Sequence, residues 1–261
     1  MIKFTVYLLI LIFFLSVSIA QSEQLQQPKI SQLQTVIDVL EIETSARTIW
    51  ELAYGYGDIE NKPKSPKEVI EDIDVWLKNK PDKDEQKGQI AEYQLVVKHR
   101  DNLVRLFQEF KLVGTQLGEF VYLRGTIPVR FALKDNSLTL LITGVASEYT
   151  YNTLRTTAKS RAAKIIESMI LPSLKNIHEF FSSSDIKYFG MVVVYSSKDF
   201  SKKSRVLKLK AEVVSLVIAS DKCKQFVEGK ITQEDLVDSA DVYLFDRDMV
   251  TGIKKVKVSL E

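Results

Sequence analysis

The sequence has very little cysteine and histidine, which narrows the chemistry that it can carry. Cys223 is the single cysteine among 261 residues, and His99 and His178 are the two histidines. One cysteine excludes an internal disulfide, so the fold must be held by a hydrophobic core. Neither histidine has a partner at a metal-binding helical spacing such as His-x-x-x-His. The sequence therefore predicts no catalytic, cofactor-binding or metal-binding residue, and no cofactor.

The chain also lacks an excess of charge of either sign. It contains 36 Lys and Arg against 34 Asp and Glu, a formal net charge of +2 at pH 7. A domain that binds nucleic acid is expected to carry a strongly basic surface. We therefore expect no nucleic-acid partner.

Long hydrophobic runs are missing except at the N-terminus. There, Lys3 precedes an almost unbroken apolar run from Val6 to Val17, which ends in Ser18-Ile19-Ala20. A positive charge, an apolar core of about twelve residues and a small-x-small ending are typical of a cleavable signal peptide. We expect residues 1–20 to be removed after Ala20. The alternative is an uncleaved membrane anchor, which needs about eighteen or more apolar residues.

Three further absences bear on where the chain acts. No cysteine stands at the expected cleavage point, so a lipid anchor is not expected. The later apolar stretch from Val213 to Ala219 is too short to cross a membrane, which takes about twenty residues. No asparagine lies in an Asn-x-Ser/Thr sequon, which favours a bacterial periplasm over a glycosylating pathway. We expect a soluble exported protein, periplasmic or extracellular, that contacts the membrane only through its signal peptide.

Sequence motifs for catalysis are also missing. There is no Gly-x-Ser-x-Gly elbow, no glycine-rich phosphate loop and no His-Glu-x-x-His. Cys223 lies between Lys222 and Lys224, which could lower the pKa of its thiol. Three readings stay open for it: an ordinary free thiol, which we favour, an intermolecular disulfide, or a reactive nucleophile that would need a histidine nearby.

Two clusters could be mistaken for binding sites. The first is acidic and lacks the regular spacing of a calcium-binding loop, so caps, turns and solvated faces explain it better than a metal or a carboxylate pair. The second is aromatic and could bind a sugar or a peptide, although helical spacing favours interhelix packing. The acidic cluster comprises Glu234, Asp235, Asp238, Asp241, Asp246 and Asp248, and the aromatic cluster comprises Trp50, Tyr54, Tyr56 and Trp76.

Residues 21–113 have the apolar spacing of amphipathic helices. The pattern predicts one helix from about residue 30 to 54, a second from Pro66 to Lys78 with Ser65 as N-cap, and a third, longer helix that carries the apolar stripe from Ile90 to Phe110. Together they would form a helical hairpin, a three-helix segment or a coiled-coil projection.

Residues 114–261 change to a mixed pattern, beginning at Gly114 and Gly118, which we expect to form the turn from helix to strand. We predict a hairpin at 127–142 that turns at Asp135-Asn136-Ser137, a second hairpin at 186–219, and a helix at 149–181 that Pro172 kinks or divides. Two short helices follow, the second opened by the capping-box-like Thr232-Gln233-Glu234-Asp235, and then a small hairpin at 241–258. Pro128 cannot donate to a ladder, so its strand is expected at an edge or bulged at that point. The predicted fold is α+β, with an antiparallel sheet of two hairpins packed on one long helix.

From these features we expect an exported, non-enzymatic protein of the cell envelope that acts through protein contacts, with open strand edges as candidate contact sites. Two alternatives remain. One is an exported hydrolase whose site is assembled from distant residues, such as Cys223 with a histidine or a carboxylate pair. The other is a small-ligand-binding protein with a pocket between helices and sheet.

Overall fold

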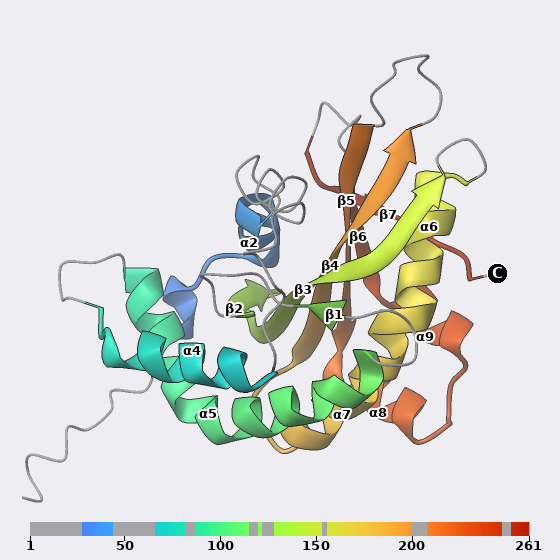
Figure 1. The fold of residues 1–261 in the computed structure, drawn as a ribbon. Helices are drawn as coiled ribbons and strands as arrows, with labels where there is room; N and C mark the ends of the chain where they lie inside the picture. Colours follow the sequence, from blue (N-terminus) through green and yellow to red (C-terminus); the bar gives the residue numbers. More distant parts are fainter. Residues whose placement is uncertain are drawn as a thin grey trace, which may run out of the picture.

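The computed structural model describes residues 28–43, 66–81, 87–114, 120–121, 128–152, 156–199, 208–246 and 252–260, which form an α+β fold (Figure 1). The strands are β1 (Phe120–Val121), β2 (Val129–Lys134), β3 (Ser137–Asn152), β4 (Tyr188–Asp199), β5 (Lys208–Ala219), β6 (Asp241–Asp246) and β7 (Lys254–Val256). The helical elements are η1 (Ile30–Gln32), α2 (Val36–Glu43), α4 (Pro66–Lys78), α5 (Lys87–Gly114), α6 (Ala158–Ile165), η2 (Ile166–Ile170), α7 (Leu171–Phe181), α8 (Ser220–Val227) and α9 (Gln233–Ser239). The signal peptide and its cleavage site at Ala20 lie outside the described residues.

The seven strands form one mixed sheet in the order β1-β3-β4-β5-β6-β7, and β2 also pairs with β3. Side chains alternate between its two faces, as strand geometry requires. In β4, Phe189, Met191 and Val193 join a large hydrophobic cluster with helices α4 to α9, whereas Val192 and Val194 join a smaller cluster with α2. The helices α2 and α5 accordingly lie on opposite sides of β2 (Figure 1).

The predicted hairpins are present, but the predicted antiparallel sheet is wrong. β2 and β3 pair antiparallel, and so do β4 and β5, whereas β3 and β4 pair in parallel, for example Leu140 with Phe189. The cause is the helical crossover of α6, η2 and α7, which returns the chain to the end of the sheet where β3 began. The small final hairpin of β6 and β7 is confirmed as antiparallel.

The long helix predicted at 149–181 is also wrong in its start. Strand β3 continues to Asn152, and α6 begins after Thr157, whose side chain accepts a hydrogen bond from the Ser160 N–H at 3.1 Å. The predicted break near Pro172 appears as the π-helical segment η2, directly before α7. A wider turn at this point accommodates a ring that would clash with the carbonyl four residues earlier.

The N-terminal helices are partly as predicted. α4 and α5 match their expected ranges, but the first helix is interrupted at residues 33–35. Thr35 starts α2 as a new helix: the side chain of Asp38 accepts from the Thr35 N–H at 3.0 Å, and Thr35 Oγ1 accepts from the Asp38 N–H at 3.2 Å. The reciprocal pair satisfies two N–H groups that would otherwise lack partners.

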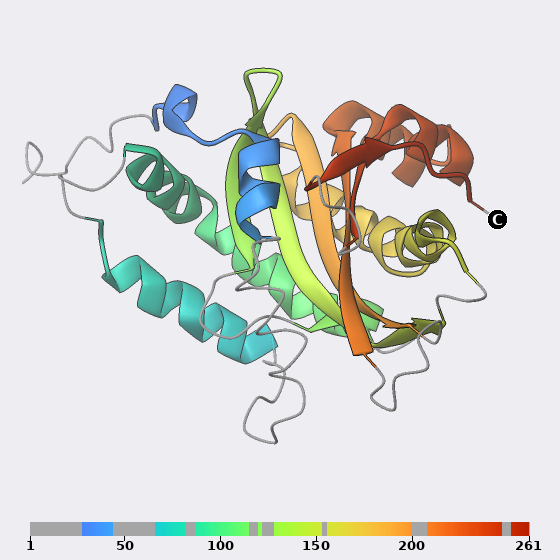
Figure 2. The same ribbon diagram turned by 90° about the horizontal axis from the view of Figure 1, so that it is seen from above.

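The helices predicted as a separate segment share the core of the sheet. Ile73 of α4 and Leu95 of α5 belong to the same buried cluster as Phe181 of α7 and Met191 of β4. At the opposite end of the molecule from α4 lies the α8–α9 pair (Figures 1 and 2). None of the helices within the described ranges has the length and apolar content needed to cross a membrane.

Strand β2 is an edge strand, as Pro128 predicted, but its edge is closed. The Phe131 N–H donates to the carboxylate of Glu92 on α5 at 3.1 Å, and the Leu133 N–H donates to the Gln34 carbonyl at 2.8 Å. Glu92 also pairs with Arg130 at 2.8 Å. At the other edge, β7 is three residues long and includes Lys254 and Lys255. Short, lysine-rich or covered edges are how sheets avoid pairing with other chains.

Candidate functional site

The described residues form a polar pocket at one end of the sheet, where the β2–β3 turn, the start of β4, the end of β5 and the start of β6 meet. Its volume is about 260 Å³. The residues that line it are Lys134, Tyr188, Val217, Ala219, Asp221, Lys222, Ser239 and Asp241. Strands far apart in the sheet order contribute to this one site, because the sheet curves there.

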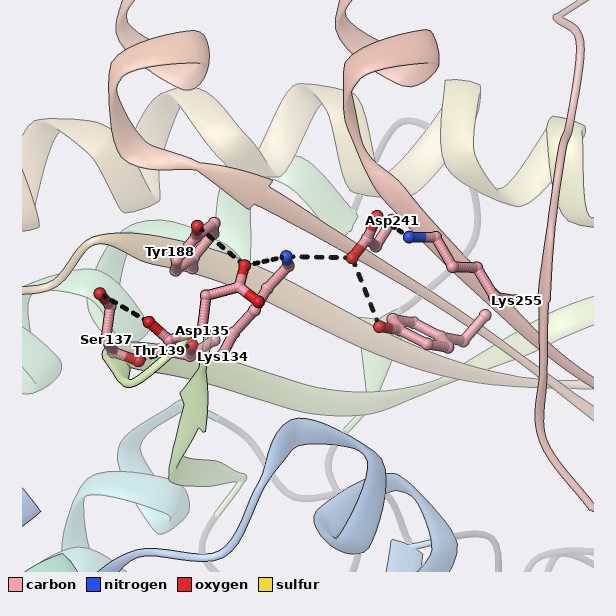
Figure 3. A network of polar contacts seen from close by, with 8 residues as sticks. Lys134, Asp135, Ser137, Thr139, Tyr188, Asp241 and Lys255 are labelled. Carbon is pink, nitrogen blue, oxygen red and sulfur yellow. Dashed lines mark hydrogen bonds and ion pairs between the residues drawn. The ribbon is translucent and has the colours of Figure 1, made fainter. Parts of the chain in front are cut away.

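Lys134 is the centre of the polar network beside this pocket (Figure 3). Its Nζ lies 2.8 Å from Asp135 Oδ2 and 3.1 Å from Asp241 Oδ2, and 4.6 Å from the centroid of the Tyr188 ring. Asp241 is held in turn by Lys255 Nζ at 2.5 Å. The network therefore ties β2, the β2–β3 turn, β6 and β7 together.

A tight turn places the carboxylate of Asp135 in this network. Asp135 and Asn136 have φ of 50° and 57°, so both central residues of the two-residue β2–β3 turn are left-handed. This geometry suits the twist of a hairpin, and Asp and Asn tolerate it better than most residues. It allows Tyr188 to donate its hydroxyl hydrogen to Asp135 Oδ2 at 3.2 Å.

The charges of the network hold each other in their ionised forms. Burial acts to lower the pKa of Lys134, but its hydrogen bonds to Asp135 and Asp241 outweigh burial and raise that pKa well above its usual value. Burial acts to raise the pKa of Asp241, and hydrogen bonds from Lys255 and Lys134 reverse this and lower it. Lys134 is thus a permanent cation. It is not suited to act as an amine nucleophile, because that role needs a depressed pKa.

Cys223 is deeply buried on α8. Burial raises the pKa of its thiol to about 12, and its Sγ lies 3.6 Å from the Leu174 carbonyl oxygen on α7. The neighbouring lysines therefore do not activate it, and the folded protein does not present it to another thiol. Of the three readings of Cys223, the structure supports the ordinary free thiol.

We expect Cys223 to react with a thiol reagent such as DTNB at least roughly 100-fold more slowly in the native protein than in guanidinium chloride, because labelling requires local unfolding. As a control, a Cys223→Ser, Glu179→Cys double variant carries its thiol at an exposed position of α7 and should react rapidly without denaturant. Rapid labelling of native Cys223 would contradict the assignment.

His99 is enclosed rather than placed in a cleft. It is 5% exposed, and its ring lies 5.7 Å from that of Phe131 and 5.9 Å from that of Phe181. Its Nε2 is 3.4 Å from Asp185 Oδ1, and Asp185 also pairs with Lys98 at 2.8 Å. Burial lowers the pKa of His99 more than the Asp185 charge raises it. No nucleophile accompanies this histidine among the described residues, so it packs helix α5 against α7 and β2.

His178 and Cys223 do not form a catalytic pair in the described residues. His178 is on α7, where burial lowers its pKa and its charged neighbours are Lys224 and Glu228. The recorded polar contact of Cys223 is the Leu174 carbonyl. The hydrolase alternative therefore loses the first of its two versions, Cys223 with a histidine.

The other predicted clusters have structural explanations where they are described. Asp235 and Thr232 form the capping box of α9, with hydrogen bonds of 3.1 Å in each direction. Trp76 packs against Tyr93, with ring centroids 5.5 Å apart. Within the described ranges, no group of three His, Cys, Asp or Glu is placed to hold a metal ion. Trp50, Tyr54, Tyr56, Gly118 and Asp248 lie outside the described residues.

Sequence reasoning identified Asp241 as part of an acidic cluster but missed Lys134 and Tyr188. The Asp135-Asn136 turn was the available signal, since it predicted the hairpin that carries Lys134. Its contact with Asp241 could not be predicted from spacing, because the curvature of the sheet brings β2 and β6 together. Comparison of the chain with protein-family models, curated proteins and solved structures finds no match.

Proposed function

We propose that this chain is an exported, non-enzymatic protein of the cell envelope that acts by binding another protein. The N-terminal sequence supports export. The geometry supports the non-enzymatic part through what the reactive side chains do: Cys223 is buried, His99 is enclosed by aromatic rings and Lys134 is held by two carboxylates.

The distribution of exposed apolar side chains carries the protein-binding part of the proposal. Ile30, Ile37, Ile42 and Val75 are 36 to 55% exposed, and all four lie on η1, α2 or α4. Among the residues from 87 onward whose side-chain exposure is described, none is an exposed large hydrophobic residue. Apolar surface gathered on one part of a molecule favours a contact site there. Val75 lies on α4, which packs on the other face of the sheet from α2, so we assign the contact to α2, which carries Ile37 and Ile42.

The closed edge of β2 supports the same choice. A partner strand needs unpaired backbone groups, and on β2 the Phe131 and Leu133 N–H groups already donate within the chain. Helix packing is therefore favoured over strand addition.

The charges of α2 indicate the chemistry of the partner. Asp38 and Glu41 are exposed on the outer side of the helix, between Ile37 and Ile42, while Val39 and Leu40 face the sheet. A matching surface would combine apolar residues with Lys or Arg, because opposite charges at the rim steer and orient association.

Photo-cross-linking in intact cells tests the proposal. A benzophenone amino acid placed at position 37 or 42 of the full chain should give the same covalent adduct, recovered from the periplasmic or secreted fraction. The matched control is position 179, since Glu179 is exposed on α7, away from the apolar positions. Absence of an adduct at both positions, or the same adduct from position 179, would overturn the proposal.

A further inference from the structure

The charged groups at the base of the pocket beside Lys134 cancel in sum and are already paired with one another. Asp241 Oδ2 accepts from Lys134 at 3.1 Å and from the Tyr243 hydroxyl at 3.5 Å, while Asp241 Oδ1 binds Lys255. Lys134 is itself shared between Asp135 and Asp241. These groups position one another, so a ligand would not need to neutralise either charge.

The rim of the pocket carries one further negatively charged side chain and one further positively charged side chain. Asp221 and Lys222 from the first turn of α8 line it, and neither has an ion pair recorded within the described part of the chain. Asp221 is exposed and Lys222 is half-buried. Together with Lys134 and Asp241, the lining has two lysines and two aspartates, so its formal charges cancel. A ligand with a net charge gains no overall attraction from such a lining, whereas one with both charges finds a partner for each.

The rest of the lining sets the size and apolar character of a ligand. The Tyr188 ring, Val217 and Ala219 form an apolar wall beside the charged rim. A pocket of about 260 Å³ is smaller than the sites that hold drug-sized molecules, which begin near roughly 300 Å³. At roughly 30 Å³ for each heavy atom, the share of one water in the liquid, it has room for a molecule of about nine heavy atoms.

We propose that this pocket binds a free amino acid in its zwitterionic form. Asp221 would receive the ammonium group, Lys222 the carboxylate, and Tyr188 and Val217 the apolar part of the side chain. This site is distinct from the apolar surface of α2 and α4, so it does not depend on the proposed protein contact.

Calorimetric titration of the mature chain tests the proposal with three probes: L-leucine, isoamylamine, which lacks the carboxylate, and 4-methylpentanoate, which lacks the amine. We expect L-leucine to bind, and each single analogue to bind at least about tenfold more weakly, because a charged partner is then left unpaired. Equal binding of an analogue, or no heat from L-leucine at millimolar concentration, would overturn the proposal.

Variants on the rim give an independent check. Asp221→Asn and Lys222→Gln should each weaken L-leucine binding by about tenfold or more. Lys224→Gln is the matched control, because Lys224 is exposed on the same helix but does not line the pocket. Unchanged affinity in both rim variants, with the fold intact by circular dichroism, would assign any leucine binding to another place on the chain.

Discussion

Replacing Arg161 with Met should lower the free energy of unfolding by about 3–5 kcal/mol, and Glu212→Met should do the same. Arg161 of α6 and Glu212 of β5 are 4% and 1% exposed, and two hydrogen bonds of 2.8 and 2.5 Å join the guanidinium to the carboxylate. Arg161 also donates to the Thr156 carbonyl at 2.6 Å. Removing one partner leaves a charge in the core that water cannot reach, and this causes the loss.

The double variant separates an uncompensated charge from a loss of packing. With Arg161→Met and Glu212→Met together, no charge remains buried, and we expect a stability within about 1–2 kcal/mol of the unmodified chain. Guanidinium denaturation of the four proteins completes the cycle. A double variant as unstable as the sum of the singles would contradict the interpretation.

An exposed ion pair provides the control for this cycle. Arg100 and Asp74 join α5 to α4 at 2.7 Å, but both side chains are 39% exposed. Arg100→Met should therefore cost no more than about 1 kcal/mol, because water solvates the charge that remains. A cost as large as that at Arg161 would show that burial is not the deciding factor.

Gly190→Ala should lower the free energy of unfolding by about 1–3 kcal/mol, and Gly190→Val by more. Gly190 is buried near the start of β4, where an added Cβ would lie 2.6 Å from Leu141 Cδ2 and 3.1 Å from Val217 Cγ2. The neighbouring strands β3 and β5 contribute these two side chains, so the cost comes from crowding inside the sheet face. Thermal or chemical unfolding measures it.

Shortening Leu141 should recover part of that loss. Leu141→Ala alone removes a buried side chain and costs about 2–5 kcal/mol, but combined with Gly190→Ala it should cost less than the sum of the two. Gly229→Ala is the control, since Gly229 has a φ of +69° and nothing within 4 Å of an added Cβ. Its cost comes from backbone strain and should add to that of Leu141→Ala. Additive costs at Gly190 would reject the proposed contact.

The elements that sequence reasoning predicted well are those with local causes. Pro66 at the start of α4, the Thr232–Asp235 capping box of α9 and the Asp135-Asn136 turn all act within a few residues of the chain. Each such signal depends on hydrogen bonds or φ preferences that the adjacent residues supply themselves. The predicted break near Pro172 has the same local origin.

The errors occurred where a distant partner decides the outcome. Residues 149–152 were predicted to begin a helix, yet residues 150–152 pair in parallel with Ser196–Lys198 of β4. The open edge predicted for β2 is covered by Glu92 and Gln34, which are remote in the sequence. Neither contact has a local signal, because both depend on how the helices return the chain to the sheet.

The sequence by itself determined the α+β class, the two main hairpins and the expectation of export, since these follow from periodicity, turn chemistry and the composition of the first twenty residues. Tertiary structure decided that β3 and β4 run parallel, that Arg161 meets Glu212 inside the core, and that Lys134 meets Asp241 beside a pocket. The physical reason is that a crossover connection and a curved sheet bring together strands whose local sequence gives no signal of which strands they will contact.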